Sequence, residues 1–187
     1  MAMNLNEEFI SVDVETSGPN PRDYAMLSIG ACTISEPRKT FYVELKPDVE
    51  GFTREALSIS NLSLEKLKKE GTPAEDAMQK FAQWVEDVVP EKSQPVFTAF
   101  NAPFDWMFVN DYFHRYLGFN PFGHKALDMK ALYMGLRKTK WMDTSYNTVI
   151  EKTGIETALT HHALEDAIQQ AKIFEILLGE LRGEDHV

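Results

Sequence analysis

Alternating hydrophobic and polar positions near the start of the chain predict a β-sheet. Phe9–Val14 alternates and is rich in residues that favour strands, and Tyr24–Ile34 and Thr40–Leu45 continue the pattern. The turn-forming cluster Gly18-Pro19-Asn20-Pro21 separates the first two segments. Because the connections are short, we expect these three strands to form an antiparallel meander.

Beyond residue 50 the apolar positions change to helical spacing, and strands then alternate with helices. The short apolar run Pro95–Phe100 predicts a buried strand and Ala126–Asp128 a brief one. The predicted helices are Arg54–Ser60, Leu64–Lys69, Ala74–Val88, Pro103–Leu117, Met129–Leu136 and His162–Leu181. This order predicts an α/β fold in a single domain over residues 1–187, with a mixed five-stranded sheet flanked by helices.

Composition and charge narrow the function classes. The 187 residues carry a net charge of −10, which argues against a protein that grips nucleic acid through a broad basic face. One cysteine, Cys32, cannot form an internal disulfide and has no zinc-site spacing around it, so we expect it to pack in a strand. No apolar run approaches the ~20 residues that span a bilayer, and the first residues lack a signal pattern. We therefore expect a cytoplasmic protein without membrane contact.

The charge is unevenly distributed along the chain. The segment Asn120–Val149 holds five basic residues against Asp128 and Asp143, so it carries +3 while the remainder carries −13. Lysines on helix surfaces are usually only solvated. This segment is nevertheless where contacts to a nucleic-acid backbone are best sought.

Two carboxylates on one strand are the first candidate for chemistry. Side chains alternate across a strand, so Asp13 and Glu15 point to the same side while Val14 packs behind them. Such a pair repels unless a cation lies between its members, and hard divalent ions prefer oxygen ligands. Taken alone, the pair is more often two acids on a solvated face.

Two further acids join the candidate site. Asp105 lies in the first turn of the helix after a buried strand, and ligands collect at such strand ends, although a favourable helix dipole also explains an acid there. Asp166 lies on an otherwise apolar helix face, where a carboxylate needs a partner or a metal. His161 suits an entry loop over the site and His162 shares a helical face with Asp166. Periodicity alone does not choose between the two histidines.

Three motifs carry a family resemblance. The residues Asp13-x-Glu15-Thr16, Asn101-x-x-Phe104-Asp105, and His161 with Asp166 after four intervening residues resemble the exonuclease motifs of the DEDDh superfamily. They occur in the family's order and cover essentially the whole chain. Other stretches resemble the ribonuclease T group, namely Ala56–Leu62, Asn120-Pro121-Phe122 and Leu127-Asp128. The resemblance implies a ribonuclease H-like fold, 3′–5′ exonuclease activity and His161 as the family histidine.

The resemblance also implies a mechanism. Two Mg²⁺ or Mn²⁺ ions held by Asp13, Glu15, Asp105 and Asp166 would stabilise attack by water on a phosphodiester, with Asp13 bridging both ions. We expect His161, as general base, and Glu15 to be catalytic residues. The expected substrate is the 3′ end of single-stranded RNA or DNA, and the expected product is a nucleoside 5′-monophosphate. Members of this size are often dimers, so a homodimer is an expectation that no sequence feature establishes.

Residues near the expected metal site are candidates for holding the substrate. Thr16, Ser17 and Gly18 offer hydroxyl and backbone N–H groups to the terminal nucleotide, and Asn101 belongs to the second motif. Phe104 matches a position that stacks on 3′ bases, with Phe122 as a weaker candidate, and both are also plausible core residues. Pro19 departs from the family pattern, which usually has a bulky apolar or aromatic residue there.

Other residues and other functions fit the sequence less well. We expect Trp84, Trp141, Met107, Met129, Met134 and Met142 to pack in or near the core, and Asp128 to cap a helix. A polymerase proofreading component, a 3′-end binding module without activity and a Ca²⁺-binding structural domain are the alternatives. The complete set of four acids with His161 argues against the last two.

Overall fold

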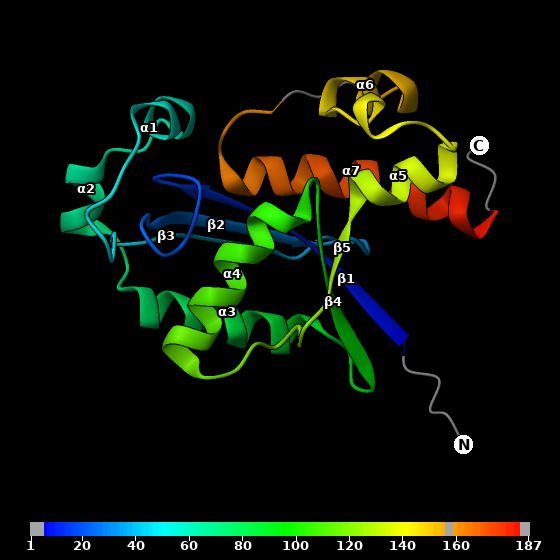
Figure 1. The fold of residues 1–187 in the computed structure, drawn as a ribbon. Helices are drawn as coiled ribbons and strands as arrows, with labels where there is room; N and C mark the ends of the chain where they lie inside the picture. Colours follow the sequence, from blue (N-terminus) through cyan, green and yellow to red (C-terminus); the bar gives the residue numbers. More distant parts are fainter. Residues whose placement is uncertain (1–5, 156–158, 184–187) are drawn as a thin grey trace.

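Five strands form one mixed sheet in the computed structural model, which describes residues 6–155 and 159–183. The strand order is β3-β2-β1-β4-β5, with antiparallel pairing among the first three and parallel pairing from β1 to β4 and β5 (Figure 1). The strands are β1 (Asn6–Thr16), β2 (Met26–Thr33), β3 (Thr40–Glu44), β4 (Ser93–Ala99) and β5 (Ala126–Asp128). The predicted meander and the mixed five-stranded sheet are confirmed.

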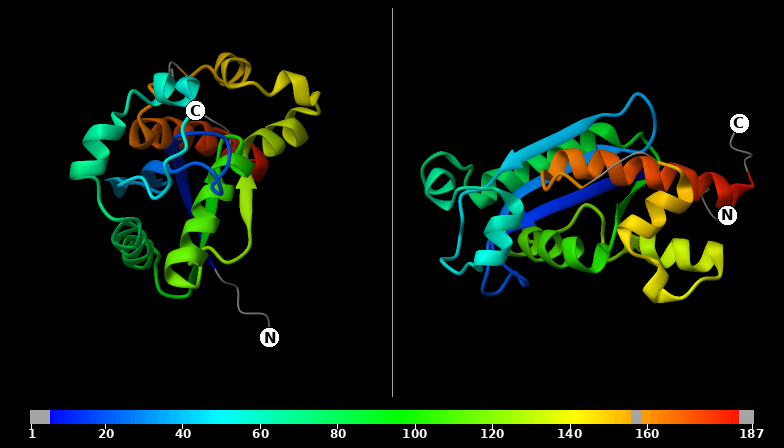
Figure 2. Two further views of the ribbon diagram at one scale, coloured as in Figure 1. Left: turned by 60° about the vertical axis from the view of Figure 1, so that its left-hand side comes forward. Right: turned by 90° about the horizontal axis from the view of Figure 1, so that it is seen from above.

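Helices cover both faces of this sheet. They are α1 (Arg54–Ser60), α2 (Leu64–Glu70), α3 (Ala74–Val88), α4 (Ala102–Leu117), α5 (Met129–Arg137), α6 (Tyr146–Thr153) and α7 (Ala163–Arg182), with a 3-10 turn η1 (Trp141–Asp143). Figures 1 and 2 show α7 along one face and α3 with α4 on the other. The helices α5 and α6 pack beside α7 through Tyr133, Val149, Ile173 and Leu177.

The alternation in β1 divides its side chains between these two layers. Ile10, Val12 and Val14 pack in the core formed with α3 and α4. Phe9 faces the opposite layer, where its ring lies 5.0 Å from that of Phe174 in α7. The odd-numbered positions therefore look toward α7, and this orientation brings Asp13 and Glu15 to the α7 side of the sheet.

The structure decides between the two alternatives for Phe122 and corrects the expectation for two other side chains. Phe122 is buried among the rings of Phe81, Phe97 and Phe113, so it is a core residue, as one of the alternatives had it. Trp141 and Met142 are not core residues, because they are 47% and 84% exposed. Cys32 is fully buried with its Sγ 3.6 Å from the Ala167 carbonyl oxygen, and burial raises the pKa of its thiol to about 12.

One helix and one turn between residues 140 and 155 are absent from the predicted set. Four of the eight residues of α6 are β-branched, which lowers helix propensity and hides the element from a pattern search. The capping residues were the available signal: the Ser145 hydroxyl accepts a hydrogen bond from Thr148 N–H, and Gly154 ends the helix with φ 72°. Within the described residues, no helix has the length and apolar character required to cross a membrane.

Candidate active site

Four carboxylates meet where β1 and β4 end. Asp13 and Glu15 lie on β1, Asp105 is in the first turn of α4 directly after β4, and Asp166 is in the first turn of α7. All four line one cleft of about 200 Å³, together with His161 and Gln170. The topology thus brings together acids that are 153 positions apart in the chain, between residues 13 and 166.

A glycine on β2 allows α7 to contribute to this cleft. Gly30 pairs with Asp13 across the sheet, and the backbone of Ala163 and Leu164 lies so close above it that a methyl group at residue 30 would overlap both. The N-terminus of α7 therefore seats directly on the sheet. This contact sets the distance between Asp166 and the carboxylates of β1.

Hydrogen bonds fix the carboxylates on β1 and α4. Asp105 Oδ1 accepts a bond of 3.1 Å from the Val14 N–H, which ties the start of α4 to β1. Gln170, one turn after Asp166, donates from Nε2 to Asp13 Oδ1 over 2.6 Å. The Oε1 atom of the same side chain accepts from the Phe100 N–H at 2.7 Å. Gln170 was missed in the sequence, although its position four residues after Asp166 places it on the same helix face.

Asp166 holds the loop that carries His161. Its Oδ1 accepts from the N–H and the hydroxyl of Thr160 at 2.7 and 3.1 Å, and its Oδ2 accepts from the His161 N–H at 2.9 Å. His161 itself has a left-handed backbone with φ 58°, a conformation uncommon for a residue with a side chain. Ligand atoms of Glu15, His161 and Asp166 lie within 4.8 Å of one another.

The neighbouring histidine has a different environment. His162 occupies the position before α7 and its ring stacks on Tyr42 of β3, with ring centroids 4.5 Å apart. The predicted helix start at His162 is therefore one residue early. Of the two histidines, His161 is the one that lines the carboxylate cleft.

Burial and mutual repulsion favour the protonated forms of the carboxyl groups in the cleft. Burial, followed by repulsion from Asp105, Glu15 and Asp166, raises the pKa of Asp13 well above its usual value. Burial and then Asp166 raise the pKa of Glu15 to about 7, and burial raises that of Asp105 to about 8. The described residues that line the cleft include no lysine or arginine. An oxygen-rich site of this kind fits a hard divalent cation, which would neutralise the acids.

A second pocket adjoins the carboxylates. It has a volume of about 330 Å³ and shares Val14, Glu15 and Phe104 with the cleft. Thr16, Gly18 and Pro19 form one wall, and Ala56 and Ile59 of α1 form another. Phe104 is half-buried and borders both spaces, so its ring is available to a ligand that reaches from one to the other.

Ser17 is engaged within the turn and is absent from the residues that line this pocket. Its hydroxyl donates to the Gly51 carbonyl oxygen at 2.7 Å and accepts from the Ala25 N–H at 2.9 Å. Both bonds engage the hydroxyl within the protein, and a contact of Ser17 with a nucleotide stays a prediction. The Thr16 hydroxyl also turns inward and donates to the Gly18 carbonyl oxygen at 2.9 Å.

Asp128 joins the second motif to α5. Its carboxylate accepts from the Lys130 and Ala131 N–H groups, as the predicted helix cap should. It also accepts from the Asn101 and Ala102 N–H groups at 3.0 and 3.1 Å. These bonds hold Asn101 in a left-handed conformation, φ 70°, at the edge of the cleft.

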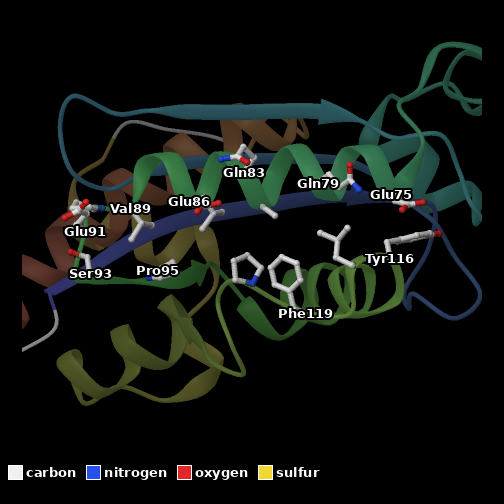
Figure 3. A pocket seen from close by; sticks show the side chains of 15 residues that line it. Glu75, Gln79, Gln83, Glu86, Val89, Glu91, Ser93, Pro95, Tyr116 and Phe119 are labelled. Atoms are coloured by element: carbon white, nitrogen blue, oxygen red, sulfur yellow. The ribbon is translucent and has the colours of Figure 1, made fainter. Parts of the chain in front are cut away.

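A larger groove than the cleft and the adjoining pocket lies elsewhere in the described part of the molecule. It measures about 950 Å³ and runs between α3 and the end of α4, beside the first residues of β4 (Figure 3). That is the opposite end of β4 from the carboxylates. Its charged lining residues are Glu75, Glu86 and Glu91, so its charge does not suit a polyanion.

Comparisons with known proteins agree with this geometry. Residues 8–178 match the family model described as the 3′-5′ exoribonuclease Rv2179c-like domain. The 3′-5′ DNA exonuclease Cap18 of Escherichia coli is 48% identical over 171 residues, which are 91% of each chain. The DNA polymerase III PolC-type of Thermotoga petrophila is 26% identical over 171 residues, which are 90% of this chain and 12% of the polymerase.

Solved structures of exonucleases share the fold of this chain. The nuclease domain of 3′hExo, a DEDDh family member solved with rAMP, has a TM-score of 0.80 at 16% identity and covers 99% of this chain and 98% of that one. Exonuclease I of E. coli, solved with a dA16 oligonucleotide, has a TM-score of 0.71 at 18% identity. The match covers 93% of this chain and 41% of that one. From the family match and the identity to Cap18, we conclude that the chain belongs to the Rv2179c-like family of DEDDh 3′–5′ exonucleases.

Proposed function

We propose that the chain is a divalent-metal-dependent 3′–5′ exonuclease that releases nucleoside 5′-monophosphates from single-stranded nucleic acid. The observation that carries the proposal is the meeting of Asp13, Glu15, Asp105 and Asp166 in one cleft without a cationic side chain among its described lining residues. Buried carboxylates with raised pKa values favour a bound cation.

The four acids are the proposed ligands of two Mg²⁺ or Mn²⁺ ions. Asp13 would be one of these ligands, since burial and repulsion from the other three carboxylates disfavour its charge without a cation. When bound, two such ions stabilise charge on the attacking and leaving oxygens of a phosphodiester. Gln170 orients the Asp13 carboxylate through its 2.6 Å hydrogen bond.

His161 is the proposed general base. It borders the cleft within 4.8 Å of ligand atoms of Glu15 and Asp166, and it is exposed to solvent. An imidazole nitrogen there is placed to accept the proton of an attacking water and to pass it to solvent. Asp166 positions the base by accepting the His161 N–H.

The pocket beside the carboxylates is the proposed site of the terminal nucleotide. Its wall of Phe104, Ala56 and Ile59 is apolar and suits a base, while the Thr16–Pro19 turn lies beside the acids where the sugar would be. In the Thr16–Pro19 turn, Pro19 supplies a rigid ring in place of the bulky apolar or aromatic side chain usual in the family. We propose that the base therefore makes a smaller contact with this turn but still touches it.

The relatives differ in the nucleic acid that they are named for. The family model is described as an exoribonuclease domain and Cap18 as a DNA exonuclease. We therefore propose that the 3′ ends of both single-stranded RNA and single-stranded DNA enter the cleft. Parallel rate measurements on RNA and DNA of the same sequence determine which is preferred.

The proposal is tested with 5′-labelled single strands of RNA and DNA incubated with Mg²⁺, Mn²⁺ or EDTA. We expect a ladder that shortens from the 3′ end and stops in EDTA and in Asp13→Asn. Glu91→Gln, a change of the same kind in the distant groove, is the matched control and should retain activity. Metal-independent cleavage, or binding of every substrate without cleavage, would contradict the proposal.

A further inference from the structure

An exposed aromatic side chain lies in η1, between α5 and α6. Trp141 in η1 is 47% exposed, and the Nζ atom of Lys130 in α5 lies 4.5 Å from the centre of its ring. Met142 beside it is 84% exposed. The indole and the lysine form a cation–π pair, and Met142 extends the exposed apolar surface beside them. We define Lys130, Lys140, Trp141 and Met142 as the Trp141 platform.

The Trp141 platform is connected to the cleft through the backbone. Asp128, at the start of α5, accepts hydrogen bonds from the Asn101 N–H on one side and the Lys130 N–H on the other. Asn101 lines the carboxylate cleft. Tyr146, a few residues beyond Trp141 at the start of α6, lines it as well. The stretch from α5 to α6 thus begins and ends at one border of the cleft.

Charge distinguishes this border from the rest of the molecule. The segment Asn120–Val149 carries five basic residues and two acidic ones in a chain of net charge −10. Lys125, Lys138 and Lys140 are exposed, whereas Arg137 is paired with Glu180 at 2.5 Å. Cationic side chains beside an exposed aromatic ring are the combination that binds single-stranded nucleic acid, because the ring stacks on a base while ammonium groups contact phosphates.

We propose that the Trp141 platform binds the substrate strand on the 5′ side of the scissile phosphate. Trp141 stacks on a base, and Lys130 and Lys140 contact the backbone phosphates. This inference rests on the proposed function, and it assigns a second contact to the same strand, separate from the terminal-nucleotide pocket. It predicts that long single strands bind more tightly than dinucleotides and that the difference comes from this border.

The first test compares substrates of two lengths in steady state. Trp141→Ala should raise the KM for a 15-nucleotide single strand by about 5- to 100-fold, the loss expected for one stacked base, and leave kcat and the KM for a dinucleotide unchanged. Trp141→Phe should restore most of the loss because it keeps a ring. A KM that does not change for the long strand, or that rises equally for both substrates, would overturn the proposal.

The second test measures binding without catalysis. Titration of an unlabelled 15-nucleotide single strand, as DNA and as RNA, into Asp13→Asn should quench tryptophan fluorescence, and the quenching should fall in Asp13→Asn with Trp141→Phe. Lys130→Ala should lower the slope of log affinity against log salt by about 0.7 per lost phosphate contact. Lys80→Ala, an exposed lysine on α3, is the matched control and should not change the slope.

These measurements separate failure of the platform from failure of the proposed function. If the parent protein shows no exonuclease activity but its fluorescence responds through Trp141, the proposed function fails and the platform stands. If activity is present and neither length dependence nor quenching involves Trp141, the platform fails and the function stands. Thermal unfolding of each variant confirms that it is folded.

Discussion

A single neutral side chain sets the geometry of the carboxylate cleft. Gln170 has one amide group, and it uses both ends: Nε2 donates to Asp13 and Oε1 accepts from Phe100 N–H. The three segments β1, β4 and α7 are thereby joined at the point where the proposed metal ions bind. Sequence patterns reveal acids more readily than such a residue, because an uncharged glutamine among apolar neighbours resembles any other helix position.

Replacement of Gln170 should weaken metal use more than folding. In Gln170→Leu the Asp13 carboxylate loses its oriented donor, so the Mn²⁺ concentration that gives half-maximal activity should rise by about 10- to 100-fold. Gln169→Leu, at the adjacent helix position, is the control and should retain the parent's metal dependence. Equal metal titrations for Gln170→Leu and the parent would show that Asp13 needs no such support.

The two adjacent histidines should respond differently to the same substitution. His161→Ala should lower kcat by about 10²- to 10⁴-fold with little change in KM, because it removes the proposed general base. His162→Ala should retain kcat and lose about 0.5–1.5 kcal/mol of stability, because its ring stacks on Tyr42. Rate and thermal-unfolding measurements on both variants test this pair. The reverse pattern would assign the base to His162.

At the scale of the element, the sequence predicted regular segments well and irregular ones poorly. The bounds of α1 and α3 agree with the predicted ranges. Thr53 caps the start of α1 and the left-handed Asn61 ends it, whereas α3 is marked by its apolar stripe. The bounds of α6 were missed because β-branched residues mask its helical character. The same limit applies to the site: Asp13, Glu15 and Asp105 follow from strand ends, whereas the inward-facing Ser17 hydroxyl depends on a turn that only the fold specifies.

The close approach of α7 to β2 can be tested with matched glycine substitutions. Gly30→Ala should cost about 1–3 kcal/mol of stability and reduce activity, since an added methyl group displaces α7 and with it Asp166. Gly135→Ala, in α5 with open space around it, should be neutral or stabilising by up to about 1 kcal/mol. Chemical denaturation and initial rates provide both readouts. Unchanged activity in a folded Gly30→Ala protein would mean that α7 tolerates the displacement.

At the scale of the whole molecule, the cleft predicts how stability depends on pH. The pKa of Glu15 rises from 4.5 to about 7, and that of Asp105 from 3.8 to about 8, when the chain folds. The folded protein therefore holds more protons than the unfolded chain between about pH 4 and pH 8, and these two groups lower stability as the pH rises through that interval.

We expect the melting temperature in EDTA to fall between pH 6 and pH 8.5. Saturating Mg²⁺ or Mn²⁺ should reduce the fall, because ligands that bind only the folded state stabilise it and ionised acids bind cations better. Glu15→Gln should also reduce the fall, as it cannot ionise. Differential scanning fluorimetry across pH gives the result, and a melting temperature in EDTA that rises through this range would contradict the assigned pKa directions.

The position of α7 also determines when a growing polypeptide acquires its chemistry. Asp13, Glu15 and Asp105 are already present in a chain that has been translated as far as β5, but Asp166 and Gln170 follow only with α7. Until that helix docks over Gly30, the cleft lacks Asp166, one of its four carboxylates. The backbone N–H of His161, the proposed base, then has no carboxylate to accept its hydrogen bond. A chain truncated before α7 is thus expected to be inactive on nucleic acid, and the docking of α7 becomes the step that completes the active site.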